Sequence, residues 1–303
     1  MLRDMDPTET IELHAGPLTF TAHARGEGPV VLCLHGFPDH ARSFRHQLPA
    51  LAEAGYRAIA PTLRGYEPSS QPSGRRYFLV DLVDDLRAWI DQLGQERVSV
   101  IGHDWGALVA QAASALIPDR LRCVATLAVP HLRRMEAAWR EVLPRQLRYS
   151  WYAMFFQLRG LADWAVRRDD WALIDRLWRS WSPGWPLPPD ERRALHETFA
   201  LPGVQRAALE YYRCNLGGLV RGGDARRSLD AASQRCSVPT LAMTGERDGC
   251  VDTRVFDHGD WRTDYLGPAR LVRVTGAGHF LHQEKPQQVN AELLDWLRQH
   301  GGG

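Results

Sequence analysis

The fold is decided by residues 98–106, which read VSVIGHDWG. A short apolar run leads directly into a helical pattern that begins at Trp105, and small residues lie two positions on either side of Asp104. A strand that turns this sharply into a helix pushes the side chain of the central residue out at the top of a sheet. Gly102 and Gly106 suit such a turn because a Cβ at either position would collide with neighbouring backbone. The stretch therefore predicts a strained turn that presents Asp104.

Asp104 has two interpretations. It can be a plain N-cap, since aspartate is a favoured residue there, but the strand before it and the flanking glycines favour a nucleophile. A carboxylate attacks carbonyl groups poorly, yet it can open a strained ring or displace a halide at an sp³ carbon, forming an alkyl-enzyme ester. Water must then attack the carbonyl carbon of Asp104. That second step needs a general base and hydrogen-bond donors for an oxyanion.

The alternation of strand and helix patterns around this turn predicts a mostly parallel sheet flanked by helices. Apolar runs typical of buried strands occur at 30–34, 57–63, 98–101, 123–129, 239–244 and 269–274. Helical periods occur at 79–93, 105–117 and 286–299. Gly94 follows the first of these helices and is expected to end it. Residues 1–130 and 229–303 are therefore predicted to form one α/β core domain.

Residues 131–228 interrupt this alternation and contain no convincing strand pattern. The segment is rich in aromatic residues, and seven of the chain's 11 tryptophans lie between Trp139 and Trp185. Residues 182–189 read SPGWPLPP, a proline-rich turn between two helical segments. We predict an all-helical cap, or lid, domain in which the tryptophans wall a dry pocket and pack short helices together.

A candidate general base and an orienting acid follow the last two predicted strands. Residues 276–280, GAGHF, place His279 on a loop at the carboxyl end of a strand, where catalytic groups of open α/β sheets gather. Residues 244–252, TGERDGCVD, offer three carboxylates after the preceding strand. Asp248 is our first choice because a glycine follows it in a tight turn, with Asp252 second and Glu246 third. This acid would hold the imidazole tautomer and stabilise the imidazolium.

Two backbone N–H groups are candidates for an oxyanion hole. Residues 35–38, HGFP, follow the first strong strand, so the N–H of Phe37 can point into the site. Trp105 directly follows the candidate nucleophile and supplies the second N–H. A plain turn at the end of the strand is the alternative for 35–38, since Gly36 and Pro38 would also explain it.

Taken together, these motifs resemble the α/β-hydrolase superfamily, in the branch that contains epoxide hydrolases and haloalkane dehalogenases. The resemblance rests on His35-Gly36-Phe37-Pro38, Gly102-His103-Asp104-Trp105-Gly106, Gly245-Glu246-Arg247-Asp248 and Gly276-Ala277-Gly278-His279. These motifs span nearly the whole chain, and the order nucleophile, acid, histidine is that of the α/β-hydrolase triad. In this branch the insertion before the acid is a helical cap, which corresponds to residues 131–228.

Two tyrosine motifs in the insertion separate the two activities. Residues 150–157, SWYAMFFQ, and 210–213, EYYR, look like the cap tyrosine motifs of soluble epoxide hydrolases. The resemblance implies that Tyr152 and Tyr212 bind the epoxide oxygen and that one of them protonates the developing alkoxide. The alternative is that both are core aromatics, as the adjacent Tyr211 illustrates.

We therefore expect an epoxide hydrolase that needs no cofactor or metal and converts a small, mainly apolar epoxide and water into a vicinal diol. A haloalkane dehalogenase with the same triad is the first alternative. Trp105 could bind its halide, but Phe37 stands where many dehalogenases carry asparagine. A ligand-binding homologue without turnover is the second alternative.

Composition narrows the partners and the location. With 44% hydrophobic and 24% charged residues the chain is an ordinary globular protein. All cations but Lys285 are arginines, yet the net charge is only +1, which argues against a nucleic-acid partner. No apolar run reaches the ~18 residues of a membrane helix, and residues 1–10 lack the apolar segment of a secretory signal. Five scattered cysteines indicate reduced thiols. We expect a cytoplasmic protein without a membrane partner, with a homodimer as one option for its assembly.

Overall fold

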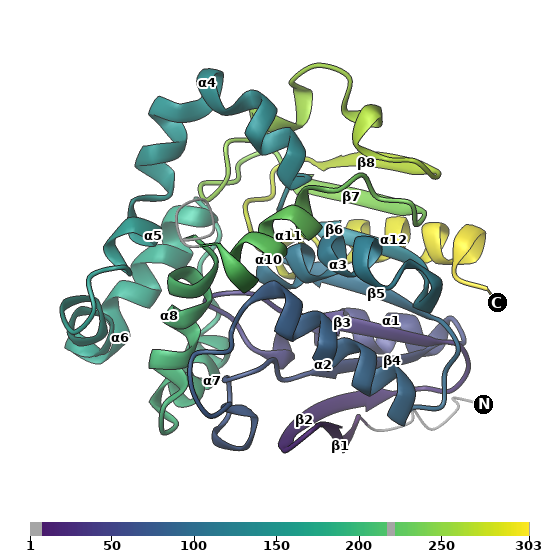
Figure 1. Ribbon diagram of the computed structural model, residues 1–303, viewed down its shortest axis with the longest axis horizontal. Coiled ribbons are helices and arrows are strands. Elements are labelled where there is room, and N and C mark those ends of the chain that lie inside the picture. Colours follow the sequence, from purple (N-terminus) through teal and green to yellow (C-terminus); the bar gives the residue numbers. More distant parts are fainter. Residues whose placement is uncertain (1–7, 217–221, 303) are drawn as a thin grey trace.

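The computed structural model describes residues 8–216 and 222–302. Within these residues a single eight-stranded sheet has the order β1-β2-β4-β3-β5-β6-β7-β8 (Figure 1). The strands are β1 (Glu9–Ala15), β2 (Leu18–Arg25), β3 (Val30–Leu34), β4 (Arg57–Pro61), β5 (Val98–His103), β6 (Leu121–Leu127), β7 (Thr240–Gly245) and β8 (Ala269–Val274). All neighbours from β4 to β8 pair in parallel, whereas β2 pairs antiparallel with both β1 and β4. The expected mostly parallel α/β sheet is confirmed.

The central strands consist of continuous apolar runs, which favour burial in the middle of the sheet. Every residue of β3, β5 and β7 is buried, as expected for parallel strands covered on both faces. The edge hairpin β1–β2 was missed by the sequence analysis. Its second strand alternates buried and half-buried positions, with Phe20 and Ala22 among those that point inward, so it lacks the continuous run.

Helices cover both faces of the sheet (Figure 1). The helices of the core are α1 (Gln47–Glu53), α2 (Leu79–Gln92), α3 (Trp105–Leu116), α11 (Leu281–Glu284) and α12 (Pro286–His300). On one face, Trp89 of α2 packs edge-on against Phe20 of β2, with ring centroids 5.0 Å apart. On the other face, Leu48 of α1 and Leu293 of α12 belong to one buried cluster with residues of β3 and β6. Gly94 follows α2 with a φ of 64°, as expected for a residue that ends a helix.

Between β6 and β7 the described residues form helices and no strand, as the sequence predicted. These helices are α4 (Leu132–Tyr149), α5 (Trp151–Phe155), α6 (Leu161–Trp181), α7 (Pro189–Ala200), α8 (Val204–Asn215) and α10 (Gly223–Ser233). Backbone angles interrupt α6 at 168–171. Helices α5 to α8 lie beyond the ends of the strands, whereas α10 packs on α2 and α3 (Figure 1). The expected boundary between residues 228 and 229 therefore falls inside α10, and residues 217–221 of the expected cap lie outside the described residues.

The short turns of 3₁₀ helix lie at Ala41–Phe44, Pro68–Ser70, Pro118–Arg120, Thr253–Asp257 and Trp261–Asp264. In the part of the chain that the structure describes, no helix combines the length and the apolar character needed to cross a bilayer.

The tryptophans of the insertion are not all interior residues, which corrects the expectation from the sequence. Trp178 and Trp181 are buried, but Trp139, Trp151 and Trp164 are 44%, 39% and 56% exposed. Guanidinium groups lie over two of the exposed rings, Arg176 at 5.7 Å from Trp151 and Arg168 at 4.9 Å from Trp164. Arginine therefore covers part of two rings that face solvent.

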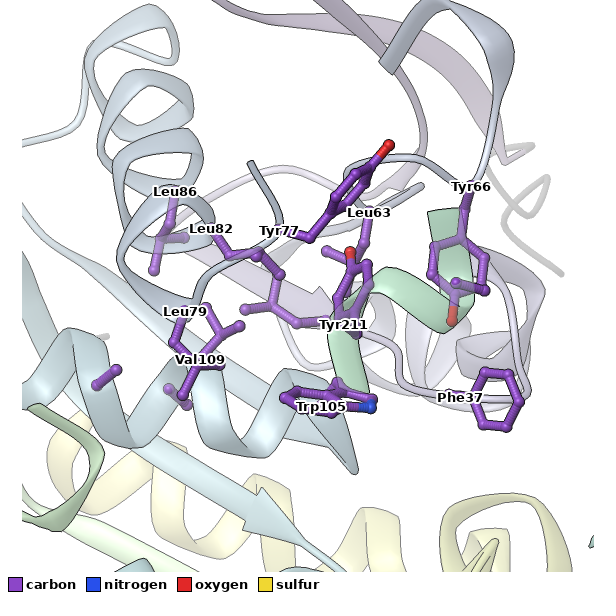
Figure 2. Close-up of a cluster of buried hydrophobic side chains, with 14 of the residues drawn as sticks. Phe37, Leu63, Tyr66, Tyr77, Leu79, Leu82, Leu86, Trp105, Val109 and Tyr211 are labelled. Atoms are coloured by element: carbon purple, nitrogen blue, oxygen red, sulfur yellow. The ribbon is translucent and has the colours of Figure 1, made fainter. Parts of the chain in front are cut away.

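An aromatic cluster joins the insertion to the sheet (Figure 2). Tyr211 of α8 lies among Tyr66, Tyr77 and Trp105, with ring centroids 5.8, 5.9 and 5.5 Å away. The Tyr211 hydroxyl donates a hydrogen bond to the carbonyl oxygen of Arg64 at 2.8 Å. Tyr211 is therefore an anchor that holds α8 against the start of α3.

Candidate active site

Asp104 is the single residue between β5 and α3, and its φ of 51° lies in the left-handed region. Asp104 occupies the N-cap position of α3, but its side chain makes no capping hydrogen bond, so capping does not account for this residue. A Cβ added to Gly102 would lie 2.1 Å from the carbonyl oxygen of Gly106, and one added to Gly106 would lie 2.0 Å from that of Leu34. Both expected collisions are confirmed, and the close packing explains how the strained turn is held.

A backbone N–H group binds the Asp104 carboxylate. Phe37 follows β3, and its N–H donates a hydrogen bond to Oδ1 of Asp104 at 2.8 Å. Gly36 allows this approach because a Cβ at that position would lie 2.3 Å from the Cβ of Asp104. Trp105 begins α3, where the first N–H groups have no partner within the helix. The 35–38 loop is therefore more than a plain turn: it binds the carboxylate.

His279 and Asp248 complete a chain of contacts behind Asp104. The Nε2 atom of His279 lies 3.4 Å from Oδ2 of Asp104, and Nδ1 lies 2.9 Å from Oδ2 of Asp248. The other Asp248 oxygen accepts hydrogen bonds from the N–H groups of Cys250 and Val251 at 2.7 and 2.9 Å. His279 is fully buried, so the loops after β7 and β8 hold the imidazole in one orientation.

The two alternative acids contact other residues than His279. The Asp252 carboxylate accepts hydrogen bonds from the backbone and side chain of Arg254. Glu246 accepts hydrogen bonds from Thr275 and from the N–H of Gly276 on the next loop. Of the three carboxylates offered by the 244–252 loop, Asp248 is thus the one that contacts the imidazole.

The charge of His279 depends on its two carboxylate neighbours. Burial acts to lower the pKa of His279, but Asp248 and Asp104 outweigh it and raise that pKa to about 10. In the site without substrate the imidazole lies between two carboxylates. At neutral pH both of its nitrogens are therefore protonated, and the ring is positively charged.

Tyr152 of α5 and Tyr212 of α8 pack against each other. Their ring centroids are 5.6 Å apart at an interplanar angle of 86°, and both residues are buried. The Tyr152 hydroxyl lies 3.3 Å from Sγ of Cys250, whereas the Tyr212 hydroxyl has no hydrogen-bond partner among the described residues. Burial raises the pKa of both tyrosines well above the usual value, with Asp104 among the further causes. Both side chains are therefore phenols that can donate a proton.

Aromatic rings enclose these two phenols. The ring of Tyr212 lies edge-on against Phe37, Phe156 and Trp105, with centroids 5.2, 5.2 and 5.1 Å away. This wall is apolar and buried, which favours an apolar ligand and limits water.

The end of α6 joins the insertion to the loops after β7 and β8. The carbonyl oxygen of Trp181 accepts hydrogen bonds from the N–H groups of Gly249 and His279, each at 3.0 Å. The indole ring of Trp181 also packs against the His279 imidazole, with centroids 5.1 Å apart. The position of the imidazole thus depends on the inserted helices as well as on the sheet.

The sequence analysis missed Cys250 as a residue of this site. Its thiol is buried beside Tyr152, and all five cysteines are free. The signal was present, because Cys250 follows Asp248 by two residues in the same loop. The spacing of Cys250 from the other cysteines indicates neither a disulfide partner nor a metal site, so the sequence alone predicts no role for it.

A buried polar network beneath the site was also missed. The Ser43 hydroxyl lies 2.5 Å from Asp39 and 2.6 Å from Nε2 of His282. The Nε2 atom of His103 lies 3.0 Å from the carbonyl oxygen of His279. Burial lowers the pKa of His103 to about 3, so this ring is neutral. Segments 35–39 and 279–283, which carry the motifs around Phe37 and His279, also carry this network, which supports the loop of His279.

Two groups of side chains in the described residues could hold a metal ion. Their ligand atoms lie within 4.8 Å of one another in each group, and the groups are Asp104 with Cys250 and His279, and Asp39 with His103 and His282.

Comparison with known proteins gives consistent matches. A family model described as alpha/beta hydrolase fold matches residues 29–286. Epoxide hydrolase A of Mycobacterium tuberculosis is 34% identical over 301 residues, which cover 89% of this chain and 90% of that protein. Epoxide hydrolase 3 of Siraitia grosvenorii is 32% identical over 320 residues, which cover 97% of this chain and 99% of that protein. The crystal structure of epoxide hydrolase A from Mycobacterium thermoresistibile matches with a TM-score of 0.79 at 29% identity, covering 98% of this chain and 100% of that one.

Proposed function

This chain belongs to the α/β-hydrolase fold family and is an enzyme of the epoxide hydrolase type, and from this premise we propose that it opens its epoxide through a covalent ester on Asp104. The proposal is carried by one arrangement: His279 lies 3.4 Å from Asp104, with Asp248 behind it. Nucleophile, base and orienting acid then occupy the roles of a catalytic triad.

The first step forms the ester. Asp104 attacks one ring carbon of the epoxide, a new carbon–oxygen bond forms, and the ring carbon–oxygen bond breaks. The departing oxygen becomes an alkoxide, which takes a proton from Tyr152 or Tyr212. The unpartnered hydroxyl of Tyr212 supports this role, because a buried donor without a partner is ready to bind a ligand oxygen. The second phenol would hold the same oxygen by a hydrogen bond.

The second step hydrolyses the ester. Alkylation removes the negative charge of Asp104, which is one cause of the raised pKa of His279. The imidazole then releases its proton more readily and can act as general base on water. The resulting hydroxide attacks the carbonyl carbon of Asp104, and the N–H groups of Phe37 and Trp105 bind the oxyanion. Collapse of this intermediate breaks the ester bond to the diol oxygen, which takes the proton that the imidazole removed from water. The proton that the imidazole released earlier restores the tyrosine phenol, and the carboxylic acid formed on Asp104 returns its proton to the imidazole.

We further propose that residues 131–228 act as a cap over a site whose triad comes from the sheet. Tyr152 and Tyr212 both belong to the inserted helices, whereas Asp104 follows β5. The rings of Phe37 and Phe156 support a small, mainly apolar epoxide as the substrate, with water as the second reactant. Every step of the proposal uses side chains, backbone N–H groups and water.

The experiment uses styrene oxide as substrate and intact-protein mass as the readout. Asp104→Ala is expected to abolish diol formation, and His279→Gln is expected to accumulate a protein heavier by the mass of one epoxide. A panel of 1-bromoalkanes, assayed for halide release, tests the dehalogenase alternative. Full turnover in both variants would contradict the proposed mechanism. Halide release without diol formation would favour the dehalogenase.

A further inference from the structure

Cys250 places a thiol beside the proposed nucleophile and base. A ligand atom of Cys250, one of Asp104 and one of His279 all lie within 4.8 Å of one another, and all three residues are buried. The Nε2 atom of His279 forms no hydrogen bond with a described residue; its nearest acidic neighbour is Oδ2 of Asp104 at 3.4 Å. The proposed reaction uses the carboxylate and the imidazole but not the thiol.

Sulfur, imidazole nitrogen and carboxylate oxygen together are a donor set typical of zinc sites. We propose that Asp104, Cys250 and His279 form an inhibitory site for a thiophilic divalent cation of the Zn²⁺ type. Three protein ligands leave a fourth position for water, as in zinc sites that are not closed.

The second face of the imidazole supports this assignment. Nδ1 of His279 lies 2.9 Å from Asp248, and a carboxylate on the far nitrogen is the usual arrangement that orients a metal-binding histidine. Nε2 is thereby left for the cation. Bonds of about 2.0–2.3 Å put two ligands of tetrahedral zinc roughly 3.3–3.8 Å apart. The observed spread of up to 4.8 Å requires a closing movement of roughly 1 Å, within the reach of side-chain rotation.

The second group of possible ligands fits this cation less well. Asp39 and His282 both already contact the hydroxyl of Ser43, at 2.5 and 2.6 Å. This group, which His103 completes, contains no sulfur, so it lacks the ligand that selects a thiophilic ion.

Occupancy would block both steps of the proposed reaction, because the cation engages nucleophile and base at once. Burial keeps the pKa of Cys250 well above the usual value, so the thiol retains its proton until a cation displaces it. The bonds that form join the metal to sulfur, to Nε2 of His279 and to a carboxylate oxygen of Asp104. The bonds that break are S–H and the Nε2–H of the protonated imidazole, and both protons pass to the buffer. Nothing is oxidised, so a chelator reverses the binding.

The test measures binding directly. Cd²⁺ is titrated into the full chain while the ultraviolet thiolate-to-cadmium charge-transfer band is followed, and Zn²⁺ affinity is measured by calorimetry. We expect one equivalent to bind to the wild type and to Cys236→Ser, whose sulfur lies beside Ser114 outside the site. Cys250→Ser should show no charge-transfer band, and its Zn²⁺ affinity should be at least about 100-fold weaker than that of the wild type. Even changes to residues that only contact a metal ligand typically reduce metal affinity by roughly 10- to 100-fold. Unchanged Zn²⁺ affinity in Cys250→Ser, or loss of binding only in His282→Ala, overturns the proposal.

A measurement on the wild type guards against a variant that does not fold. Zn²⁺ should protect Cys250 from N-ethylmaleimide in the partly unfolded protein, and EDTA should remove the protection, as mapped by peptide mass. Equal labelling with and without Zn²⁺ overturns the site. Only the inhibitory consequence rests on the proposed function: if no epoxide is turned over but the cadmium band forms, the proposed function fails and the cation site stands.

Discussion

The Nε2 atom of His279 lies 3.4 Å from Oδ2 of Asp104, so the proposed base faces the proposed nucleophile before any substrate is bound. Because the Asp104 charge helps to raise the pKa of His279 to about 10, its removal should lower that pKa. Asp104→Asn has a neutral side chain of the same shape and imitates the charge state of the ester. NMR titration of the His279 ring protons should give a pKa below the wild-type value in this variant. The same pKa in both proteins would show that Asp104 does not control the imidazole.

A second prediction concerns stability against pH. The pKa of His279 is raised from 6.5 to about 10 in the folded chain, so its protonated form stabilises the fold. This contribution is fully present below about pH 6.5 and is lost as the pH rises through about 10. As the pH rises through this window, the free energy of unfolding of the wild type should therefore fall relative to that of His279→Gln. Urea unfolding at several pH values measures it, and a difference independent of pH would contradict the assigned charge.

The two tyrosines of the proposed cap should act mainly on the first step. Removal of one proton donor or oxyanion-type donor typically costs about 10²-fold or more in rate. Tyr152→Phe and Tyr212→Phe are therefore each expected to slow ester formation by about 10²-fold, with less effect on ester hydrolysis. Rapid-mixing measurements under single-turnover conditions separate the two steps.

Tyr211→Phe is the matched control for these variants. It deletes the hydrogen bond to Arg64, which should cost about 1 kcal/mol of stability, but it leaves the pocket phenols in place. Ester formation at the wild-type rate in Tyr212→Phe, or a large rate loss in Tyr211→Phe, would reverse the assignment of the two neighbouring rings.

The sheet and the turn at Asp104 could be predicted because local sequence patterns encode them. Continuous apolar runs marked β3, β5 and β7, and the collisions at Gly102 and Gly106 follow from spacing alone. The hairpin β1–β2 was not predicted because β2 alternates apolar buried residues with mostly polar half-buried ones, and the edge strand β1 has one fully buried residue.

Side-chain neighbours from distant segments could not be predicted in the same way. Cys250 meets Tyr152 across 98 positions of the chain, and no periodicity reports such a contact. The exposure of Trp139 and Trp164 was equally hidden, since a helix can turn a large ring outward.

The choice of Asp248 over the other acids of the same loop can be tested by comparing two variants. Asp248 contacts Nδ1 of His279, whereas Asp252 is paired with Arg254. Asp248→Asn should reduce ester hydrolysis by at least about 100-fold, because the imidazole loses the group that orients it and stabilises its charge. Asp252→Asn should keep near wild-type turnover. Diol formation and the mass of any trapped ester measure both effects, and the reverse ranking would make Asp252 the acid.

The close contact of Gly102 with Gly106 gives the last prediction. A Cβ on residue 102 would lie 2.1 Å from the Gly106 carbonyl oxygen, which is a backbone atom, and the backbone also fixes the position of the Cβ. Gly102→Ala should therefore cost about 3 kcal/mol or more in stability and displace Asp104. Gly94→Ala is the control: Gly94, unlike Gly102, has a positive φ, and nothing lies within 4 Å of the added Cβ, so only about 1–2 kcal/mol of backbone strain is expected. Urea unfolding gives both costs, and diol formation reports the position of the nucleophile. Equal costs for the two variants, with turnover kept in Gly102→Ala, would mean that the turn can relax without moving the carboxylate.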